Sequence, residues 1–174
     1  MPLPAYAGIS PRMVNSQERK TTGSGGCTCL RLRKVSRGVS QIYDRHLEPF
    51  GLTVTQYGVL GHLATFGSIS IGELAEKLVM DPTTLTRNIR PLLRQGLVAV
   101  RPHRRDRRLR LLNLTAGGRK AFTRAKPGWL RAQRHIEQVF GEMETPALHA
   151  ALDRILERLA TRQKAPHLQT QAIG

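Results

Sequence analysis

Apolar residues recur at steps of three and four along much of the chain, which is the spacing of amphipathic helices. Residues 27–47 have this pattern, and it predicts a first helix that ends before Pro49. Thr53 and Gln56 have the form of a capping box, in which side chain and backbone of two residues bond reciprocally at a helix start. They predict a second helix that continues up to Gly67.

Two further helix starts follow closely on one another. Ser70 with Glu73 forms another capping box and predicts a helix of about two turns. Asp81 followed by Pro82 supplies an N-cap acid and a proline at the first helical position of the next helix. The expected buried stripe of that helix is Leu85, Ile89, Leu92 and Leu93. The pattern therefore predicts two helices joined by a very short turn.

A two-stranded hairpin is predicted after this helix pair. Residues 97–100 are expected to form the first strand, and residues 101–108 a charged loop. Leu109, Leu111 and Leu114 are expected to face the core from the returning strand. The predicted fold class is mainly α with a small β-hairpin wing, an α+β arrangement in which the hairpin accompanies a helix-turn-helix.

Long helices lie near both ends of the predicted domain. Thr115 caps a segment with helical periodicity up to Met143, and Thr145 with Pro146 starts a last helix. One short core cannot easily cover the apolar stripes of these helices and of the first helix. We therefore expect a homodimer, in which helices from both chain ends form an intermolecular bundle. The alternative is that the stripes pack only on their own domain.

The remaining residues divide the chain into one domain and two tails. Residues 1–26 and 164–174 contain little apolar periodicity and are expected to be flexible tails around a domain at 27–163. Within it, 27–48 and 116–163 are the expected dimerisation helices, and 53–115 the winged helix-turn-helix. No apolar run is long enough to cross a bilayer and the N-terminus does not resemble a secretion signal, so we expect a cytoplasmic protein.

Net charge points to a polyanionic partner. The chain has 28 Lys and Arg against 12 Asp and Glu, a formal charge of +16. Nucleic acid and an anionic membrane surface both satisfy such a charge. The membrane is the weaker candidate because the basic residues concentrate in the predicted hairpin, not opposite a wide apolar helix face. We therefore expect double-stranded DNA as partner and no membrane.

The helix that begins at Pro82 has the character of a recognition helix. Its polar face includes Thr83, Thr84, Arg87 and Asn88. Threonine and asparagine side chains contact base edges, and arginine can donate two hydrogen bonds to guanine. An ordinary solvated face is the alternative, and the preceding short helix and tight turn count against it.

The densest group of arginines occupies the tip of the predicted hairpin. Residues 101–110 contain six arginines and one acid, Asp106. A narrow minor groove would relieve the repulsion among these arginines, and Asp106 would orient its neighbours, including Arg105 and Arg108. A solvated run of charges is the alternative.

These elements together resemble the MarR family of bacterial winged-helix regulators. The resemblance covers about residues 27–162 and is carried by Leu52-Thr53-Val-Thr-Gln56-Tyr57, Ile71-Gly-Glu-Leu74-Ala75, Asp81-Pro-Thr-Thr-Leu-Thr-Arg87, Gln95-Gly96-Leu97-Val98, and Asp106-Arg-Arg108 leading into Leu114-Thr115-Ala-Gly-Gly118. It implies a dimeric DNA-binding regulator, usually a repressor of palindromic operators that a small ligand or oxidation releases. By position, Thr83, Thr84 and Arg87 would face the major groove, and Arg108 would enter the minor groove.

Two prolines depart from the family pattern. Pro91 lies inside the expected recognition helix, where it removes a hydrogen bond and crowds the carbonyl of Arg87. Pro127 has the same effect in the long helix that follows the hairpin. We expect each proline to disturb its helix.

Two cysteines are candidates for redox chemistry. Cys29 lies near the start of the first helix, where the resemblance implies the reactive cysteine of hydroperoxide-sensing relatives, and Cys27 is close by. Those sensors surround the cysteine with several tyrosines, whereas here only Tyr43 is well positioned. An inert or packing cysteine is the alternative.

Catalytic and metal-binding patterns are missing from the sequence. Asp44, His46 and Glu48 are spaced by two, so we expect them to point to different sides of a helix. We find no phosphate-binding glycine loop, nucleophile motif or metal-ligand spacing, and expect no enzyme, cofactor or metal. The main alternative function is a basic winged helix that binds RNA, or coats and structures DNA in the nucleoid without reading sequence.

Overall fold

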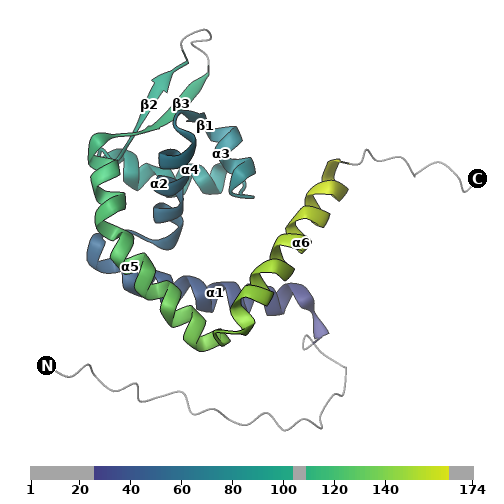
Figure 1. Ribbon diagram of the computed structural model, residues 1–174. Coiled ribbons are helices and arrows are strands. Elements are labelled where there is room, and N and C mark those ends of the chain that lie inside the picture. The colour runs from purple at the N-terminus through teal and green to yellow at the C-terminus, as the bar shows by residue number, and fades with distance from the viewer. Residues whose placement is uncertain (1–25, 104–108, 165–174) are drawn as a thin grey trace, which may run out of the picture. The chain divides into compact units, whose positions relative to one another are not determined.

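The computed structural model describes residues 26–103 and 109–164, with side chains up to Thr161 (Figure 1). The predicted tails, 1–26 and 164–174, lie almost entirely outside the described residues. The chain separates into two compact units, 1–36 and 37–174, with the boundary inside the first helix. In the first unit, the described residues contribute the N-terminal part of that helix.

The observed elements follow the predicted order of helices and hairpin. They are α1 (Thr28–Leu47), the 3-10 turn η2 (Glu48–Phe50), α2 (Val54–Phe66), β1 (Ile69–Ser70), α3 (Ile71–Lys77), α4 (Pro82–Arg94), β2 (Val98–Pro102), β3 (Arg110–Leu114), α5 (Ala116–Phe140) and α6 (Glu144–Lys164). The sequence pattern did not predict η2 or β1, because both are too short to show periodicity.

Helix caps form where the sequence indicated them. Thr53 with Gln56 and Ser70 with Glu73 make complete capping boxes at the starts of α2 and α3. At α5, the hydroxyl of Thr115 accepts a hydrogen bond from the backbone N–H of Gly118 at 2.9 Å. These bonds satisfy backbone donors that the first turn of a helix leaves unpaired, so the starts of α2, α3 and α5 are fixed locally.

The sheet has three antiparallel strands in the order β1-β3-β2. Leu112 of β3 is buried and pairs with Ile69 on one side and with Val100 on the other. The prediction that Leu109 and Leu111 face the core was wrong, because Leu109 is exposed and Leu112 is the buried residue of β3. Side chains alternate between the faces of a strand, so a buried Leu112 and a half-buried Leu114 exclude Leu111 from the same face.

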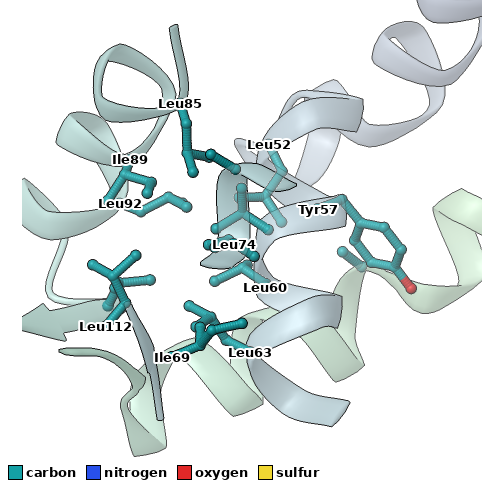
Figure 2. Close-up of a cluster of buried hydrophobic side chains, with 14 of the residues drawn as sticks. Leu52, Tyr57, Leu60, Leu63, Ile69, Leu74, Leu85, Ile89, Leu92 and Leu112 are labelled. Carbon is teal, nitrogen blue, oxygen red and sulfur yellow. The ribbon is translucent and has the colours of Figure 1, made fainter. Parts of the chain in front are cut away.

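The hydrophobic core lies among α2, α3, α4 and the sheet (Figure 2). Its largest fully buried side chains are Leu47, Val59, Leu60, Leu63, Leu74, Leu85, Ile89, Leu92 and Leu112. The predicted stripe of α4 is confirmed at Leu85, Ile89 and Leu92, while Leu93 is half-buried. This core holds α4 against α2 and α3 and thereby fixes which face of α4 meets solvent.

Glycines allow α5 to approach its neighbours closely. A Cβ on Gly118 would collide with the backbone carbonyl of Leu97, and one on Gly128 would lie 2.6 Å from the carbonyl oxygen of His46. Nearby, the ring of Tyr57 on α2 packs against Phe122 and Trp129 of α5, with centroids 4.7 Å and 6.2 Å away. The glycines thus let α5 approach Leu97 and the end of α1, and the aromatic contacts pack α5 against α2.

The two internal prolines do not end their helices. α4 continues through Pro91 to Arg94, and α5 continues through Pro127 to Phe140. Pro91 is half-buried next to the fully buried Leu92, so packing holds this turn despite the missing backbone donor.

Several large apolar side chains stay exposed on the terminal helices. α6 exposes Leu152, Ile155, Leu156 and Leu159, and the end of α5 with the following turn exposes Val139 and Met143. In the first compact unit, Leu32 and Val35 of α1 are also exposed. Among the described residues, no helix has the length and apolarity needed to span a membrane.

Candidate nucleic-acid interface

Asp81 sets the start of α4. Its carboxylate accepts hydrogen bonds from the backbone N–H groups of Thr83 at 2.7 Å and Thr84 at 3.0 Å. These bonds to the ionised form lower the pKa of Asp81 below its ordinary value, the bond from Thr84 most, and the positive charge of Arg87 adds to the effect. The side chain predicted as an N-cap is therefore also a charged group beside the candidate interface.

A row of polar side chains follows the solvent face of α4. Thr83, Arg87, Arg90 and Arg94 are exposed and lie three or four residues apart, opposite the buried stripe. Thr84 is exposed beside this row. The row presents one hydroxyl and three guanidinium groups along a single helix face, which suits contacts to phosphates and base edges.

Asn88 differs from the other predicted contacts on α4. It is half-buried, and its side-chain amide donates a hydrogen bond to the backbone carbonyl of Thr84 at 2.9 Å. One of its two amide hydrogens is therefore already engaged within the helix. Arg90 and Arg94 are better exposed, although they lie nearer the end of the helix.

The turn before α4 contains an unusual backbone conformation. Val79 has φ of 50°, the only positive φ at a non-glycine residue in the described part of the chain. Its side chain is 75% exposed. The following Met80 donates its backbone N–H to the carbonyl of Ala75 at 2.8 Å, which closes the turn. This geometry joins α3 to α4 through only four residues, 78–81, in agreement with the very short turn that the sequence predicted.

The hairpin also carries exposed arginines. Arg101 on β2 and Arg110 on β3 are exposed near its tip, where Pro102 pairs with Arg110. The predicted minor-groove residues Arg105, Asp106 and Arg108 lie outside the described residues. At this end of the fold, the structure thus gives positions for two arginines of the cluster.

A cavity of about 440 Å³ lies between α2 and α5. Its lining includes the aromatic rings of Tyr57, Phe66, Phe122 and Trp129, together with His62 and Lys126. Nδ1 of His62 is 2.9 Å from the carbonyl oxygen of Gly58, which orients the ring. Burial raises the pKa of the Tyr57 hydroxyl above its ordinary value. The cavity combines flat apolar walls with a cation at its edge.

Asp44 and Glu48 line a second cavity, of about 460 Å³, between the end of α1 and the start of α2. The prediction that Asp44, His46 and Glu48 all point to different sides was wrong for this pair, because residues four apart share a helix face. Asp44 accepts a hydrogen bond from the backbone N–H of Val54 at 2.7 Å, so its carboxylate holds the α2 start.

His46 contacts α5 instead. Its Nε2 is 3.3 Å from Nδ1 of His135, and the two rings pack edge to face. Partial burial, and then the charges of His135, Arg131 and Arg45, lower the pKa of His46 below its ordinary value. Close by, the hydroxyl of Tyr43 donates to the side-chain oxygen of Gln133.

Both cysteines are exposed free thiols. Among the described residues, no group of three or more His, Cys, Asp or Glu side chains is arranged to hold a metal ion. Neither observation tests the redox prediction for Cys29.

The short α3, the tight turn, the exposed basic helix and the β2-β3 hairpin define a winged helix-turn-helix protein. The model of the MarR family matches residues 50–109. The crystal structure of the M. tuberculosis transcriptional regulator MosR in complex with DNA is 33% identical, with a TM-score of 0.69, and the match covers 80% of this chain and 99% of that one. The chain therefore belongs to the MarR family of transcriptional regulators.

Two curated relatives extend this finding. The transcriptional activatory protein BadR of Rhodopseudomonas palustris is 34% identical over 66% of this chain and 63% of its own length. The organic hydroperoxide resistance transcriptional regulator of Bacillus subtilis is 29% identical over 52% of this chain and 61% of its own length. The names of both describe proteins that act in transcription.

Proposed function

We propose that this protein is a sequence-specific DNA-binding regulator that inserts α4 into the major groove. The observation that carries the proposal is the exposed row of Thr83, Arg87, Arg90 and Arg94 on α4, opposite a fully buried stripe. A hydroxyl and several guanidinium groups on one helix face can read base edges as well as neutralise phosphates. In this proposal Thr84 supports the row, Asn88 contributes its remaining amide hydrogen, and the wing arginines Arg105 and Arg108, oriented by Asp106, contact the minor groove.

The protein acts as a homodimer on palindromic operators. Support comes from the apolar side chains that α6 and the end of α5 expose, because such a surface is normally covered in a soluble protein. Residues 27–48 and 116–163 supply the dimer bundle, and residues 53–115 supply the winged helix-turn-helix. A two-fold dimer then presents its two α4 helices to half-sites about one helical turn apart.

Repression that a small effector relieves is the mode of regulation we propose. The cavity between α2 and α5 is the proposed effector site, since its aromatic walls and Lys126 suit a flat, anionic small molecule. A ligand there would act on α5, which packs on α2 and leads into α6. One relative is named as an activator, so a reporter gene placed behind the operator is needed to distinguish activation from repression. If the protein is a repressor, deleting it should raise the expression of the reporter.

Oxidation of Cys29 is a second proposed route of release. Its support is the exposed thiol near the start of α1 and the likeness to a hydroperoxide-resistance regulator. Organic hydroperoxide should weaken operator binding by the parent protein and leave Cys29→Ser unaffected. Cys27→Ser is the matched control and should respond like the parent. Equal responses of the parent and Cys29→Ser would contradict the sensor role.

Selection of bound fragments from the parent genome, followed by binding to randomised operators, tests the central proposal. Arg87→Ala should cost about 1–3 kcal/mol and flatten the preference at one base pair in each half-site. Arg108→Ala should weaken binding most where the minor groove is narrow, as in A-tracts. If both substitutions weaken all sequences equally, Arg87 contacts only phosphate, and a non-specific DNA-coating or RNA-binding protein becomes the better description.

A further inference from the structure

The outer face of α5 is cationic throughout. From Ala116 to Ile136 the helix contains no aspartate or glutamate. Its exposed cations are Arg119, Lys120, Arg124, Lys126, Arg131 and Arg134. The buried residues of the same helix, which include Ala125, Ala132 and Ile136, occupy the opposite side. The six cations therefore form one continuous surface, which we name the α5 basic face.

Most of these cations are not neutralised within the described part of the chain. There, none of the six makes an ion pair, and the guanidinium of Arg131 lies 6.0 Å from the centre of the Phe50 ring. α6 provides a contrast, because its exposed Arg154 and Arg158 alternate with Asp153 and Glu157. Like charges one helical turn apart destabilise a helix. A binding partner that carries negative charge would offset this cost.

The spacing of the face suits a nucleic-acid backbone. Arg119 and Arg134 are 15 residues apart, about 22 Å along the helix axis. One strand of a DNA duplex carries about six phosphates over that length, one for each cation of the face. The match in length and in number of charges favours a duplex laid along α5 over a small anion at one position.

This face is not the surface that α4 presents. α2 packs against both α4 and α5. It meets α5 through Tyr57 and Gly61, which contact Phe122, whereas α4 joins the core around Leu60 and Leu85. Apart from Lys126, which lines the cavity between α2 and α5, the cations lie on the exposed side of α5, opposite the buried residues of that helix. We propose that the α5 basic face binds a second segment of double-stranded DNA through its phosphates, so that the protein links two segments.

Two fluorescently labelled short duplexes of random sequence, one with a donor dye and one with an acceptor, test the proposal. The full-length protein should bring them together and produce energy transfer. The variant Arg119→Gln/Arg124→Gln/Arg134→Gln should still bind the donor duplex but lose the transfer, with at least a tenfold weaker capture of the second duplex. The slope of the logarithm of that capture constant against log salt should also become shallower by about 2–3, one phosphate contact per removed cation.

Matched variants separate this surface from α4 and from net charge. Arg154→Gln/Arg158→Gln on α6 should retain the transfer, although it also removes positive charge. Arg119→Lys/Arg124→Lys/Arg134→Lys should retain it as well, because phosphate contact needs charge and not guanidinium geometry. Because both duplexes have random sequence, a failed base-reading role of α4 would not be mistaken for a failure of this proposal.

Three results would overturn the proposal. The first is the absence of transfer with the parent protein, and the second is unchanged transfer with the glutamine variant of α5. The third is a glutamine variant that loses binding to phosphatidylglycerol vesicles in a flotation assay but keeps DNA bridging, since the face would then serve a membrane. Circular dichroism should show that the variant remains helical, which keeps each result interpretable.

Discussion

The winged-helix lobe and the C-terminal arm of this protein differ in how completely they bury their apolar residues. In the lobe, residues 54–114, leucines from α2, α3, α4 and β3 are fully buried in one core (Figure 2). The arm is α6. Its apolar side chains are 38–54% exposed at Leu152, Ile155, Leu156 and Leu159. Thr145 is the one buried side chain among those described in α6. The lobe is complete in one chain, whereas the apolar stripe of the arm is not.

This difference separates two sources of stability. The lobe combines local helix caps with a closed core, so it should fold as a unit whose stability does not depend on protein concentration. The exposed stripe of α6 repeats at three- and four-residue steps, which is the pattern of a helix that packs on another helix. The arm should therefore gain most of its stability when a second chain covers it, and that gain depends on concentration.

The largest expected effect is the loss of the dimer when charged residues are introduced into the apolar stripe of α6. Leu152→Asp/Leu159→Asp removes two apolar contacts from each subunit, and burying one leucine contributes about 1.5–3 kcal/mol when complete. We expect the dimer dissociation constant to rise at least about 100-fold. Light scattering should then report the 19.4 kDa chain mass in place of twice that mass.

The same experiment needs a control in which an aspartate is introduced into α6 outside the apolar stripe. Arg158→Asp lies in the same turn as Leu159 but outside the stripe, and it should leave the molecular mass unchanged. A double aspartate variant that stays dimeric would contradict the role of α6 in the bundle.

A smaller effect is expected when the same truncation is made in each region. Leu74→Ala in the lobe leaves a cavity in a fully buried site and should lower the free energy of unfolding by about 2–5 kcal/mol. Leu156 in the arm is 50% exposed. Leu156→Ala should lower the free energy of unfolding much less at protein concentrations below the dimer dissociation constant, and more above it. Urea denaturation at two protein concentrations measures both. If Leu156→Ala has the same cost at both concentrations, the stripe packs within its own chain.

Local signals in the sequence were sufficient to predict most of the lobe. The capping residues Thr53, Ser70 and Asp81 each bond within three residues of themselves, so their sequence spacing determines the geometry. β1 could not be predicted, because its two residues acquire strand geometry only by pairing with β3, more than forty residues later. The inward-facing residue of β3 was predicted wrongly for a related reason. Leu111 and Leu112 are chemically equivalent, and only the register of the sheet decides which of them faces the core.

The candidate interface was predictable in part. The polar face of α4 follows from the period of its buried stripe, so Thr83 and Arg87 could be found from the sequence. The amide bond of Asn88 to Thr84 could not, because it depends on a side-chain rotamer. The cavity between α2 and α5 also escaped the sequence pattern, since Tyr57, Phe122 and Trp129 come together only through tertiary packing. The α5 basic face was not predicted, because only the burial of the opposite side of the helix shows that its cations share one surface.

A still smaller effect is expected in the turn of the lobe, at Val79. A left-handed backbone costs a β-branched residue roughly 1–2 kcal/mol, and glycine avoids this cost. Val79→Gly should therefore raise the free energy of unfolding by about 1 kcal/mol, because the exposed valine loses little packing. Urea denaturation measures the change, with Val100→Gly as control. Val100 is also exposed but lies in β2, where glycine should destabilise. A destabilised Val79→Gly would show that the valine side chain stabilises the turn.

The smallest expected effects are pH-dependent, and they occur in different pH windows in the lobe and at the joint of α1 and α5. His46, at the joint of α1 and α5, has a pKa lowered from 6.5, first by burial and then by His135, Arg131 and Arg45. The unfolded chain therefore binds a proton at His46 more readily than the folded one, and stability falls as pH drops below about 6.5 toward the lower folded pKa. His46→Gln should remove this loss.

In the lobe, the loss of stability begins at more acidic pH and comes from the helix caps of α3 and α4. Hydrogen bonds lower the pKa of Asp81 from 3.8, chiefly that from the backbone of Thr84, and the pKa of Glu73 from 4.5, chiefly that from Ser70. Their contribution to stability is present above these ordinary values and is lost as pH falls through the folded pKa. Asp81→Ser keeps an uncharged cap, so it should flatten the acid side of the stability curve and leave the step near pH 6.5 intact. Thermal melts between pH 3 and 8 of His46→Gln, Asp81→Ser and the parent measure both windows. If Asp81→Ser changes the step near pH 6.5, the lobe and the joint of α1 and α5 are coupled and do not titrate separately.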